Sequence, residues 1–169
     1  MKILKELPGG ILLIESPRFQ DERGGFMKLF NHDTPLHKYA IAQVNYVQNR
    51  ESGILRGLHF QKGGFAESKF FRVLTGQINL VYLDVNPEST TYQLSGSYIL
   101  DQAQLGLLIP EGFATGYEVL TPHTDVLYYS NKDYHPEAEG GVNWQHPLVV
   151  NHWKTNMPIV SEKDKNWPL

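Results

Sequence analysis

The chain has 169 residues, of which 41% are hydrophobic and 20% charged, and its formal net charge is -3. This composition is typical of a globular domain, and a chain of this length can bury a sizeable core without disulfide bonds. The small negative charge and the lack of a basic run argue against nucleic-acid binding as the main role, although they allow a local positive pocket.

The sequence contains no cysteine, which excludes disulfides, thiolate metal sites and cysteine nucleophiles. Residues 1–19 are interrupted by Glu6, Pro8 and Glu15, so they offer neither a signal-peptide core nor a membrane span. We therefore expect a cytoplasmic protein without membrane contact. Because no linker or repeat divides the sequence, we expect one domain over residues 1–169.

Short strand-like runs, separated by turn residues, recur along the whole chain. They cover residues 10–16, 24–30, 42–49, 53–61, 68–76, 77–85, 91–100, 104–110, 114–121, 124–131 and 142–147. Gly76 is expected at a hairpin turn between two of these runs, and Pro110 with Gly112 at another.

Helical signals are few. Residues 33–43 begin with Asp33 or Thr34 as a cap and have a proline in the first turn, and the tail from 158 to 169 has room for one more helical turn. The regular spacing of short strands predicts an all-β fold, a double-sheet jelly-roll barrel of the cupin type with one or two short helices.

Barrels of this type often hold a metal through two motifs, G-x5-H-x-H with a later glutamate, and P-x-G-x2-H. Here the first motif offers His59, Gln61 and Glu67, and Thr115 stands where the last histidine is expected. One imidazole cannot build the N/O site that zinc, iron or manganese needs. We therefore expect no metal and no other cofactor.

Cationic residues gather near His59 in the predicted barrel. Arg56, Lys69 and Arg72 fall on neighbouring strand-like runs, where their side chains could alternate inward. Buried cations are costly unless they meet an anion. A phosphorylated or nucleotide-linked ligand fits this cluster, because arginine binds phosphate oxygens bidentately. The alternative is that His59 is an ordinary histidine packed in the barrel wall.

Six motifs along the sequence, in a fixed order, resemble those of a known family. They are FQDERGGFMKLF, QVNYVQNRESGILRGLHFQ, AESKFFRV, IPEGFATGYEVL, VLYYSNKDYHPEAEGGVNW and PIVSEKD. They are similar to the D-x-R-G-x-F, Q-x-N with LRGLH-[FY]-Q, K-x-x-R, IP-x-GFAHGF, Y-x5-Y-x-P-x-x-E and L-S-x-K-D elements of the dTDP-4-dehydrorhamnose 3,5-epimerase family. These are metal-free cupin epimerases of nucleotide-sugar pathways.

The resemblance implies a set of catalytic residues. The 4-keto group of the sugar acidifies the hydrogens at C3 and C5, and His59 corresponds to the base that removes one of them. Asp164 corresponds to the carboxylate that fixes the tautomer of this histidine, and Tyr128 to the acid that returns a proton. Lys69 stands where the family stabilises the oxyanion on O4.

The resemblance also implies binding residues and a partner. Arg56 would contact the diphosphate of a nucleotide-linked 4-keto sugar. Arg23 and Phe26 resemble residues that the partner subunit contributes to the nucleotide, which implies a homodimer with shared active sites. The other residues expected at the substrate are Gln43, Asn45, Arg72, Thr115 and Tyr134.

Two departures from the family pattern lie near the sugar. Thr115 replaces the histidine of GFAHGF, and Tyr117 replaces the phenylalanine that follows. The nucleotide (dTDP, GDP or CDP), the sugar and the choice between C3, C5 or both centres therefore stay open. The alternative function is a non-catalytic or metal-dependent cupin that binds a small anion, which would need no acid and base together.

Overall fold

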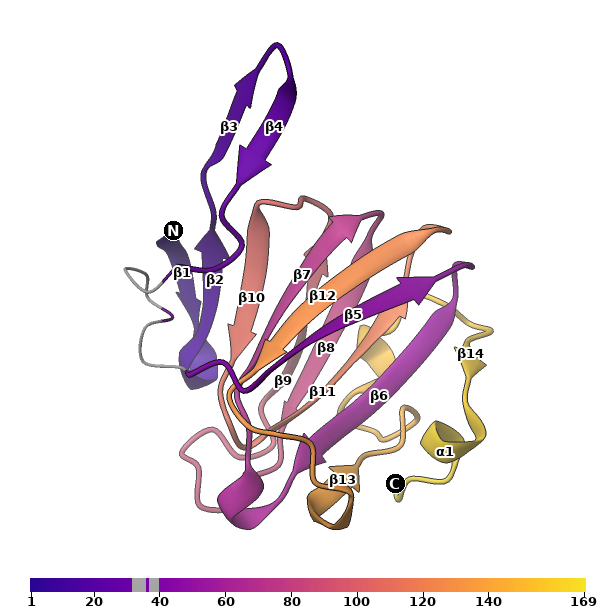
Figure 1. Cartoon of the computed structure of the whole chain (residues 1–169). Helices are drawn as coiled ribbons and strands as arrows, with labels where there is room; N and C mark the ends of the chain where they lie inside the picture. The colour runs from indigo at the N-terminus through magenta and orange to yellow at the C-terminus, as the bar shows by residue number, and fades with distance from the viewer. Residues whose placement is uncertain (32–35, 37–39) are drawn as a thin grey trace.

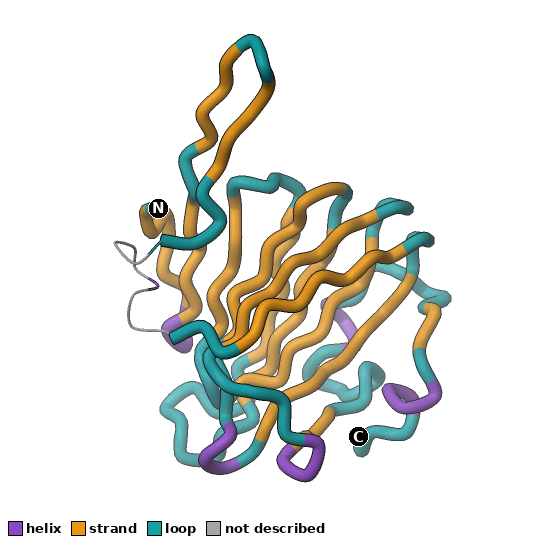
Figure 2. Tube along the Cα trace, in the orientation of Figure 1, coloured by secondary structure: helices purple, strands orange, loops and turns teal. Residues whose placement is uncertain are grey.

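The computed structural model describes residues 1–31, 36 and 40–169, which form mainly two antiparallel sheets that face each other (Figure 1, Figure 2). The first sheet has the order β1 (Lys2–Leu7), β2 (Ile11–Glu15), β10 (Leu105–Ile109), β7 (Lys69–Thr75), β12 (Thr124–Ser130) and β5 (Gln43–Asn49). The second has the order β13 (Glu139–Gly141), β6 (Ile54–Gln61), β11 (Phe113–Val119), β8 (Ile78–Asp84) and β9 (Ser95–Leu100), and β14 (Ile159–Val160) pairs with β6 in parallel. The predicted all-β double-sheet fold is confirmed.

The hydrophobic core lies between the sheets and leaves one region open. Phe71, Val73 and Val126 of the first sheet share a buried cluster with Ile78 and Leu80 of the second. Inward-facing residues along β7 change from Val73 in this cluster to Lys69, whose side chain lines a cavity. The core thus fixes the sheet spacing next to the cavity.

Both predicted hairpin turns are wrong in one respect. Gly76 does lie in a turn, but it joins β7 to β8, and these strands belong to different sheets. Pro110 and Gly112 likewise join β10 to β11 across the two sheets. A glycine turn between two apolar runs marks a reversal of the chain, but it does not say whether the second strand pairs with the first.

The strand predicted for residues 142–147 is also wrong. This segment forms turns after β13, and the side-chain amide of Asn143 donates to the carbonyl oxygens of Lys165 (2.9 Å) and Trp167 (3.1 Å). The segment therefore anchors the C-terminal tail and does not extend a sheet. The short strands β1, β13 and β14 and the strand Arg18–Asp21 were not predicted.

The helical turn predicted in the tail is confirmed as α1 (Glu162–Lys165), whose first residues are capped by Ser161 Oγ, which accepts from Asp164 N at 3.1 Å. The helical start predicted at Asp33 or Thr34 lies outside the described residues. The other helices in residues 1–31 and 40–169 are single 3-10 turns: η1 (Pro8–Gly10), η3 (Gly63–Phe65), η4 (Pro136–Ala138) and η5 (Val150–His152). In the described part of the chain, none of the helices has the length and apolarity that crossing a membrane requires.

A separate hairpin of β3 (Arg18–Asp21) and β4 (Gly24–Met27) projects from the two sheets (Figure 1). We call it the arm. Phe19 and Phe26 face each other across its two strands and are 63% and 60% exposed. Two exposed rings on a projecting hairpin are the kind of surface that protein interfaces cover.

Candidate active site

Two adjoining cavities of about 540 and 360 Å³ lie between the sheets. Both are lined by His59, Lys69, Tyr128 and Lys163. His59 comes from β6 of the second sheet, whereas Lys69 and Tyr128 come from β7 and β12 of the first. The structure therefore brings three of the predicted catalytic residues to one space from opposite walls.

His59 is paired with Asp164, as predicted. His59 Nε2 lies 2.6 Å from Asp164 Oδ1, and Asp164 Oδ2 accepts from the backbone N–H of Gly57 at 3.1 Å. Burial acts to raise the pKa of the Asp164 carboxyl, but the hydrogen bond from His59, the charge of His59 and the Gly57 N–H outweigh it and hold the pKa below its usual value. A carboxylate in this position fixes Nε2 as the protonated nitrogen and leaves Nδ1 free to accept a proton.

Tyr128 and Lys69 form the opposite wall. The Tyr128 ring stacks on Phe71, with centroids 5.2 Å apart. Burial raises the pKa of Tyr128, the charge of Glu67 raises it further, and Arg56 opposes the rise. The phenol is therefore protonated at neutral pH. Lys69 Nζ lies 3.0 Å from Glu67 Oε1.

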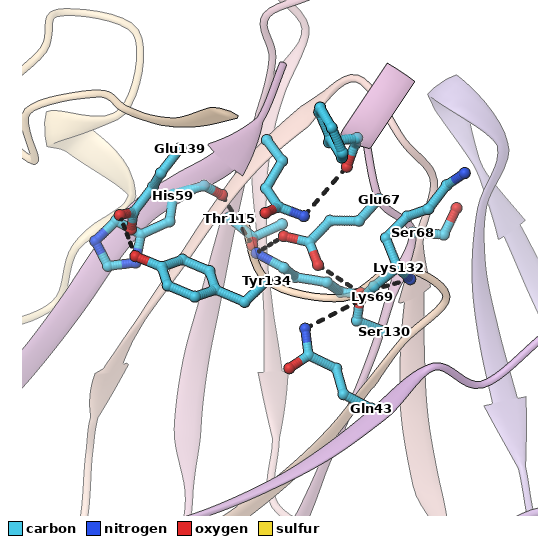
Figure 3. A network of polar contacts seen from close by, with 12 residues as sticks. Gln43, His59, Glu67, Ser68, Lys69, Thr115, Ser130, Lys132, Tyr134 and Glu139 are labelled. Carbon is cyan, nitrogen blue, oxygen red and sulfur yellow. Dashed lines mark hydrogen bonds and ion pairs between the residues drawn. The ribbon is translucent and has the colours of Figure 1, made fainter. Parts of the chain in front are cut away.

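The predicted polar lining lies in the smaller cavity (Figure 3). Gln43 Nε2 donates to the carbonyl oxygen of Lys132 at 3.0 Å, and Asn45 lies beside Tyr128 in the neighbouring strand. The hydroxyl of Tyr134 donates to Glu139 Oε2 at 2.7 Å. Glu139 also binds Lys163 Nζ at 2.7 Å. Gln43, Asn45 and Tyr134 are thus brought to the site.

Gln61, which occupies the position of a possible second metal ligand, has another use. Its amide nitrogen donates to the carbonyl oxygens of Phe65 and Asp133, both at 3.1 Å, and its amide oxygen accepts from His135 N at 2.6 Å. It thereby holds the backbone on both sides of Tyr134. Among the residues that the structure describes, no group of three or more His, Cys, Asp or Glu could hold a metal ion. Metal-free action stays a prediction.

Arg56 and Thr115 line the larger cavity. Arg56 is an exposed residue, and its Nε donates to Asn49 Oδ1 at 3.1 Å. Thr115 is only 5% exposed, and its hydroxyl lies 3.5 Å from the carbonyl oxygen of His59. Tyr117 lines the same space, and burial raises its pKa to about 12.

Arg72 does not reach either cavity, contrary to the prediction. It is fully buried, Nη1 donates to the carbonyl oxygen of Ala103 at 2.6 Å, and Nη2 donates to Ser16 Oγ at 2.9 Å. The physical reason is the period of two in a strand: Lys69 and Arg72 are three positions apart on β7 and point to opposite faces. Burial lowers the pKa of Arg72 to about 10.

Arg23 and Phe26 lie on the arm and do not line the cavities of their own chain. Arg23 Nη2 instead pairs with Asp21 Oδ2 at 2.6 Å. A role of the arm in the site of a second subunit therefore stays a prediction.

Three charged residues that line the cavities were not predicted as functional. Glu67 was weighed only as a metal ligand, and Glu139 and Lys163 were not named, although both line the smaller cavity. The family motifs could have identified two of them, because Glu139 is the glutamate of Y-x5-Y-x-P-x-x-E and Lys163 is the lysine of L-S-x-K-D.

Comparisons with known proteins agree with this fold and identify the family. The family model of dTDP-4-dehydrorhamnose 3,5-epimerase matches residues 6–169. The enzyme of that name from Methanothermobacter thermautotrophicus is 36% identical over 98% of this chain and 92% of its own.

Solved structures are similar over nearly the whole chain. The dTDP-4-dehydrorhamnose 3,5-epimerase of Bacillus anthracis, with TDP and pyrophosphate bound, has a TM-score of 0.93 and 34% identity and covers 99% of this chain and 98% of that one. The Legionella pneumophila dTDP-6-deoxy-D-glucose-3,5-epimerase, in complex with dTDP-4-keto-L-rhamnose, has a TM-score of 0.88 and 28% identity over 97% and 90% of the two chains. The chain therefore belongs to the dTDP-4-dehydrorhamnose 3,5-epimerase family, which confirms the predicted enzyme class, an isomerase.

Proposed function

We propose that this protein epimerises a nucleotide-linked 4-keto-6-deoxy sugar at C3, at C5 or at both. The observation that carries the proposal is the arrangement of His59 and Asp164, 2.6 Å apart, across one cavity from Tyr128 and Lys69. The bound TDP and dTDP-4-keto-L-rhamnose of the two similar structures favour a dTDP-linked substrate.

The proposed reaction moves two protons. Nδ1 of His59 removes the hydrogen next to the 4-keto group, and an enolate forms whose oxygen is stabilised by the ammonium of Lys69. Tyr128 then donates its phenolic proton to the carbon. Because His59 and Tyr128 come from opposite sheets, the proton leaves and returns on different sides, as inversion requires. Exchange with solvent restores both groups.

Cations at the cavity suit the diphosphate of such a substrate. Arg56 is exposed and lines the larger cavity, and the donors of its guanidinium match phosphate oxygens. Arg23 and Phe26 of a partner subunit would complete the nucleotide site, which makes the active form a homodimer.

Deuterium wash-in tests this function. The protein is incubated in heavy water, with and without EDTA, with dTDP-4-keto-6-deoxyglucose and its GDP- and CDP-linked counterparts. We expect mass spectrometry to show exchange with the dTDP sugar, unaffected by EDTA, and NMR to identify the exchanged carbons. Binding of dTDP without exchange into any 4-keto sugar would instead support a non-catalytic binding protein, and loss of exchange with EDTA would support a metal enzyme.

A further inference from the structure

Glu67 is a buried carboxylate at the cavity that the proposed reaction does not use. It precedes β7, is 9% exposed, and lines the smaller cavity together with Lys69 and Tyr128. Figure 3 shows its carboxylate beside Lys69 and Ser130. An ionised group in such a place is costly unless its oxygens are occupied by donors. Its neighbours therefore indicate what it does.

Both oxygens of Glu67 are occupied. Oε1 lies 3.0 Å from Lys69 Nζ, and Oε2 accepts from Ser130 Oγ at 2.5 Å. Lys69 and Ser130 are direct partners in the pairing of β7 with β12. The Glu67 carboxylate thus contacts both residues of this pair. One of its oxygens accepts from the hydroxyl of Ser130, and the other binds the ammonium of Lys69.

The contact with Glu67 is the ion pair of Lys69. Its side chain is 12% exposed, and within the described ranges Glu67 is the one carboxylate at ion-pair distance from it. The other carboxylates of the cavity are engaged elsewhere, Asp164 with His59 and Glu139 with Lys163. An ammonium on four methylenes has many rotamers, and a fixed acceptor at its end selects among them.

We propose that Glu67 is the positioning residue that holds the ammonium of Lys69 toward the oxygen on C4 of the sugar, an inference that rests on the proposed epimerase function. An ammonium has three donors. Glu67 occupies one, and the others are left for the substrate oxygen as it gains negative charge. Glu67 contacts Lys69 directly, and its loss therefore affects the enolate more than the bound ketone, which lowers kcat rather than raising KM. The charge of Glu67 also raises the pKa of Tyr128, and the double-mutant cycle separates this effect from the one that acts through Lys69.

A double-mutant cycle tests this relationship in the full-length protein. Wash-in rate, kcat and KM are measured for Glu67→Gln, Lys69→Met and the double variant. We expect Lys69→Met to lower kcat by about 10²- to 10³-fold, as for loss of an oxyanion donor. Glu67→Gln should lower kcat by roughly 10-fold or more with KM within about threefold, and it should cost less than about twofold when Lys69 is already methionine.

Glu118→Gln is the matched control, because Glu118 is also buried but accepts from Asn79 Nδ2 and from the backbone N–H of Lys154, outside both cavities. Glu118→Gln should change kcat by the same factor in the wild type and in the Lys69→Met variant. If Glu67→Gln does not fold, Glu67→Asp, which keeps the charge and shortens the reach, takes its place in the cycle with the same expected pattern.

Two failures are distinguishable. Independent, multiplicative effects of the Glu67 and Lys69 substitutions in a wild type that exchanges deuterium would overturn this inference alone. A wild type that exchanges nothing would overturn the proposed function and this inference with it.

Discussion

Arg56 and His59 lie three positions apart on β6, yet both side chains line the same cavity. In a regular strand they would point to opposite faces. The pairing of β6 with β11 shifts between them, because Thr115 pairs with His59 whereas Tyr117 pairs with Arg56, so that three steps on β6 match two on β11. This β-bulge turns the proposed phosphate-binding and proton-transfer residues toward one space.

Gly57 makes the bulge possible, and its substitution is the first prediction. Its φ is +108°, and a Cβ there would lie 2.6 Å from both Gly116 Cα and the carbonyl oxygen of Thr115. We expect Gly57→Ala to lower the free energy of unfolding in urea by about 2 to 4 kcal/mol and to reduce deuterium wash-in. Gly64→Ala is the control, since no atom lies within 4 Å of its Cβ position. Equal stability of the two variants would contradict this account.

Replacing the base and the acid should have different effects. His59→Asn removes the proposed base, so exchange at every carbon should fall by at least about 10²- to 10⁴-fold. Tyr128→Phe removes only the donor on the opposite wall. Exchange from the His59 side should therefore continue while net epimerisation stops. Tyr92→Phe, at a tyrosine that is 49% exposed and outside both cavities, should change neither rate.

Wash-in measured by mass spectrometry and product configuration measured by NMR separate these cases. Near wild-type exchange in His59→Asn would show that another group is the base.

Asp164 should make the stability of the fold depend on pH. Its pKa is lowered below the usual 3.8 in the folded protein, so the ionised carboxylate stabilises the fold above the pKa of the unfolded chain. That contribution disappears as the pH falls through the folded pKa. We therefore expect the difference in unfolding free energy between wild type and Asp164→Asn to be largest near neutral pH and to shrink below about pH 4.

Urea unfolding at several pH values measures this difference. Asp101→Asn, at an exposed carboxylate, is the control and should stay within about 0.5 kcal/mol of wild type throughout. A difference for Asp164→Asn that does not change with pH would mean that the pair with His59 does not stabilise the fold through its charge.

The arm prediction can be tested by mixing inactive subunits. Arg23→Ala with Phe26→Ala in one chain should leave the fold intact, because both residues are exposed on the arm and line neither site cavity of their own chain. Substrate binding should be weak, because the proposed role of these residues is in the site of the partner subunit. In a heterodimer with a His59→Asn subunit, one site would combine an intact His59 with an intact arm. Random reassociation of equal amounts should therefore restore about one quarter of wild-type activity per site. No recovery in verified heterodimers would show that sites are not shared.

Individual residues show which features of the fold and of the site can be predicted from the sequence alone. The tail helix and most strands follow from their local patterns. The pairing of His59 with Asp164, 105 positions apart, could be expected only from the family motifs, because strand periodicity carries no information about such long-range contacts. The two-residue period of a strand correctly places Lys69 and Arg72 on opposite faces of β7. The same period would place Arg56 and His59 on opposite faces of β6, which is wrong, because the bulge between them depends on how β6 pairs with β11.

Thr115 is the departure from the family motif that lies nearest to His59, and the last prediction concerns it. Thr115 pairs with His59 in the sheet, lines the larger cavity, and directs its hydroxyl toward the His59 carbonyl oxygen at 3.5 Å, the limit of a hydrogen bond. A histidine here would reach further into the cavity and could donate to a sugar oxygen, whereas threonine leaves that space open.

A sugar that is misplaced by about 1 Å can react on the order of 10²-fold more slowly. We therefore expect wild type to convert dTDP-4-keto-6-deoxyglucose poorly to the product inverted at both C3 and C5, and Thr115→His to improve this conversion. Thr115→Val, which keeps the shape and lacks the hydroxyl, should bring no improvement. NMR of the deuterated product assigns each centre. Efficient exchange at both carbons by the wild type would mean instead that the space beside Thr115 has no effect on which centres react.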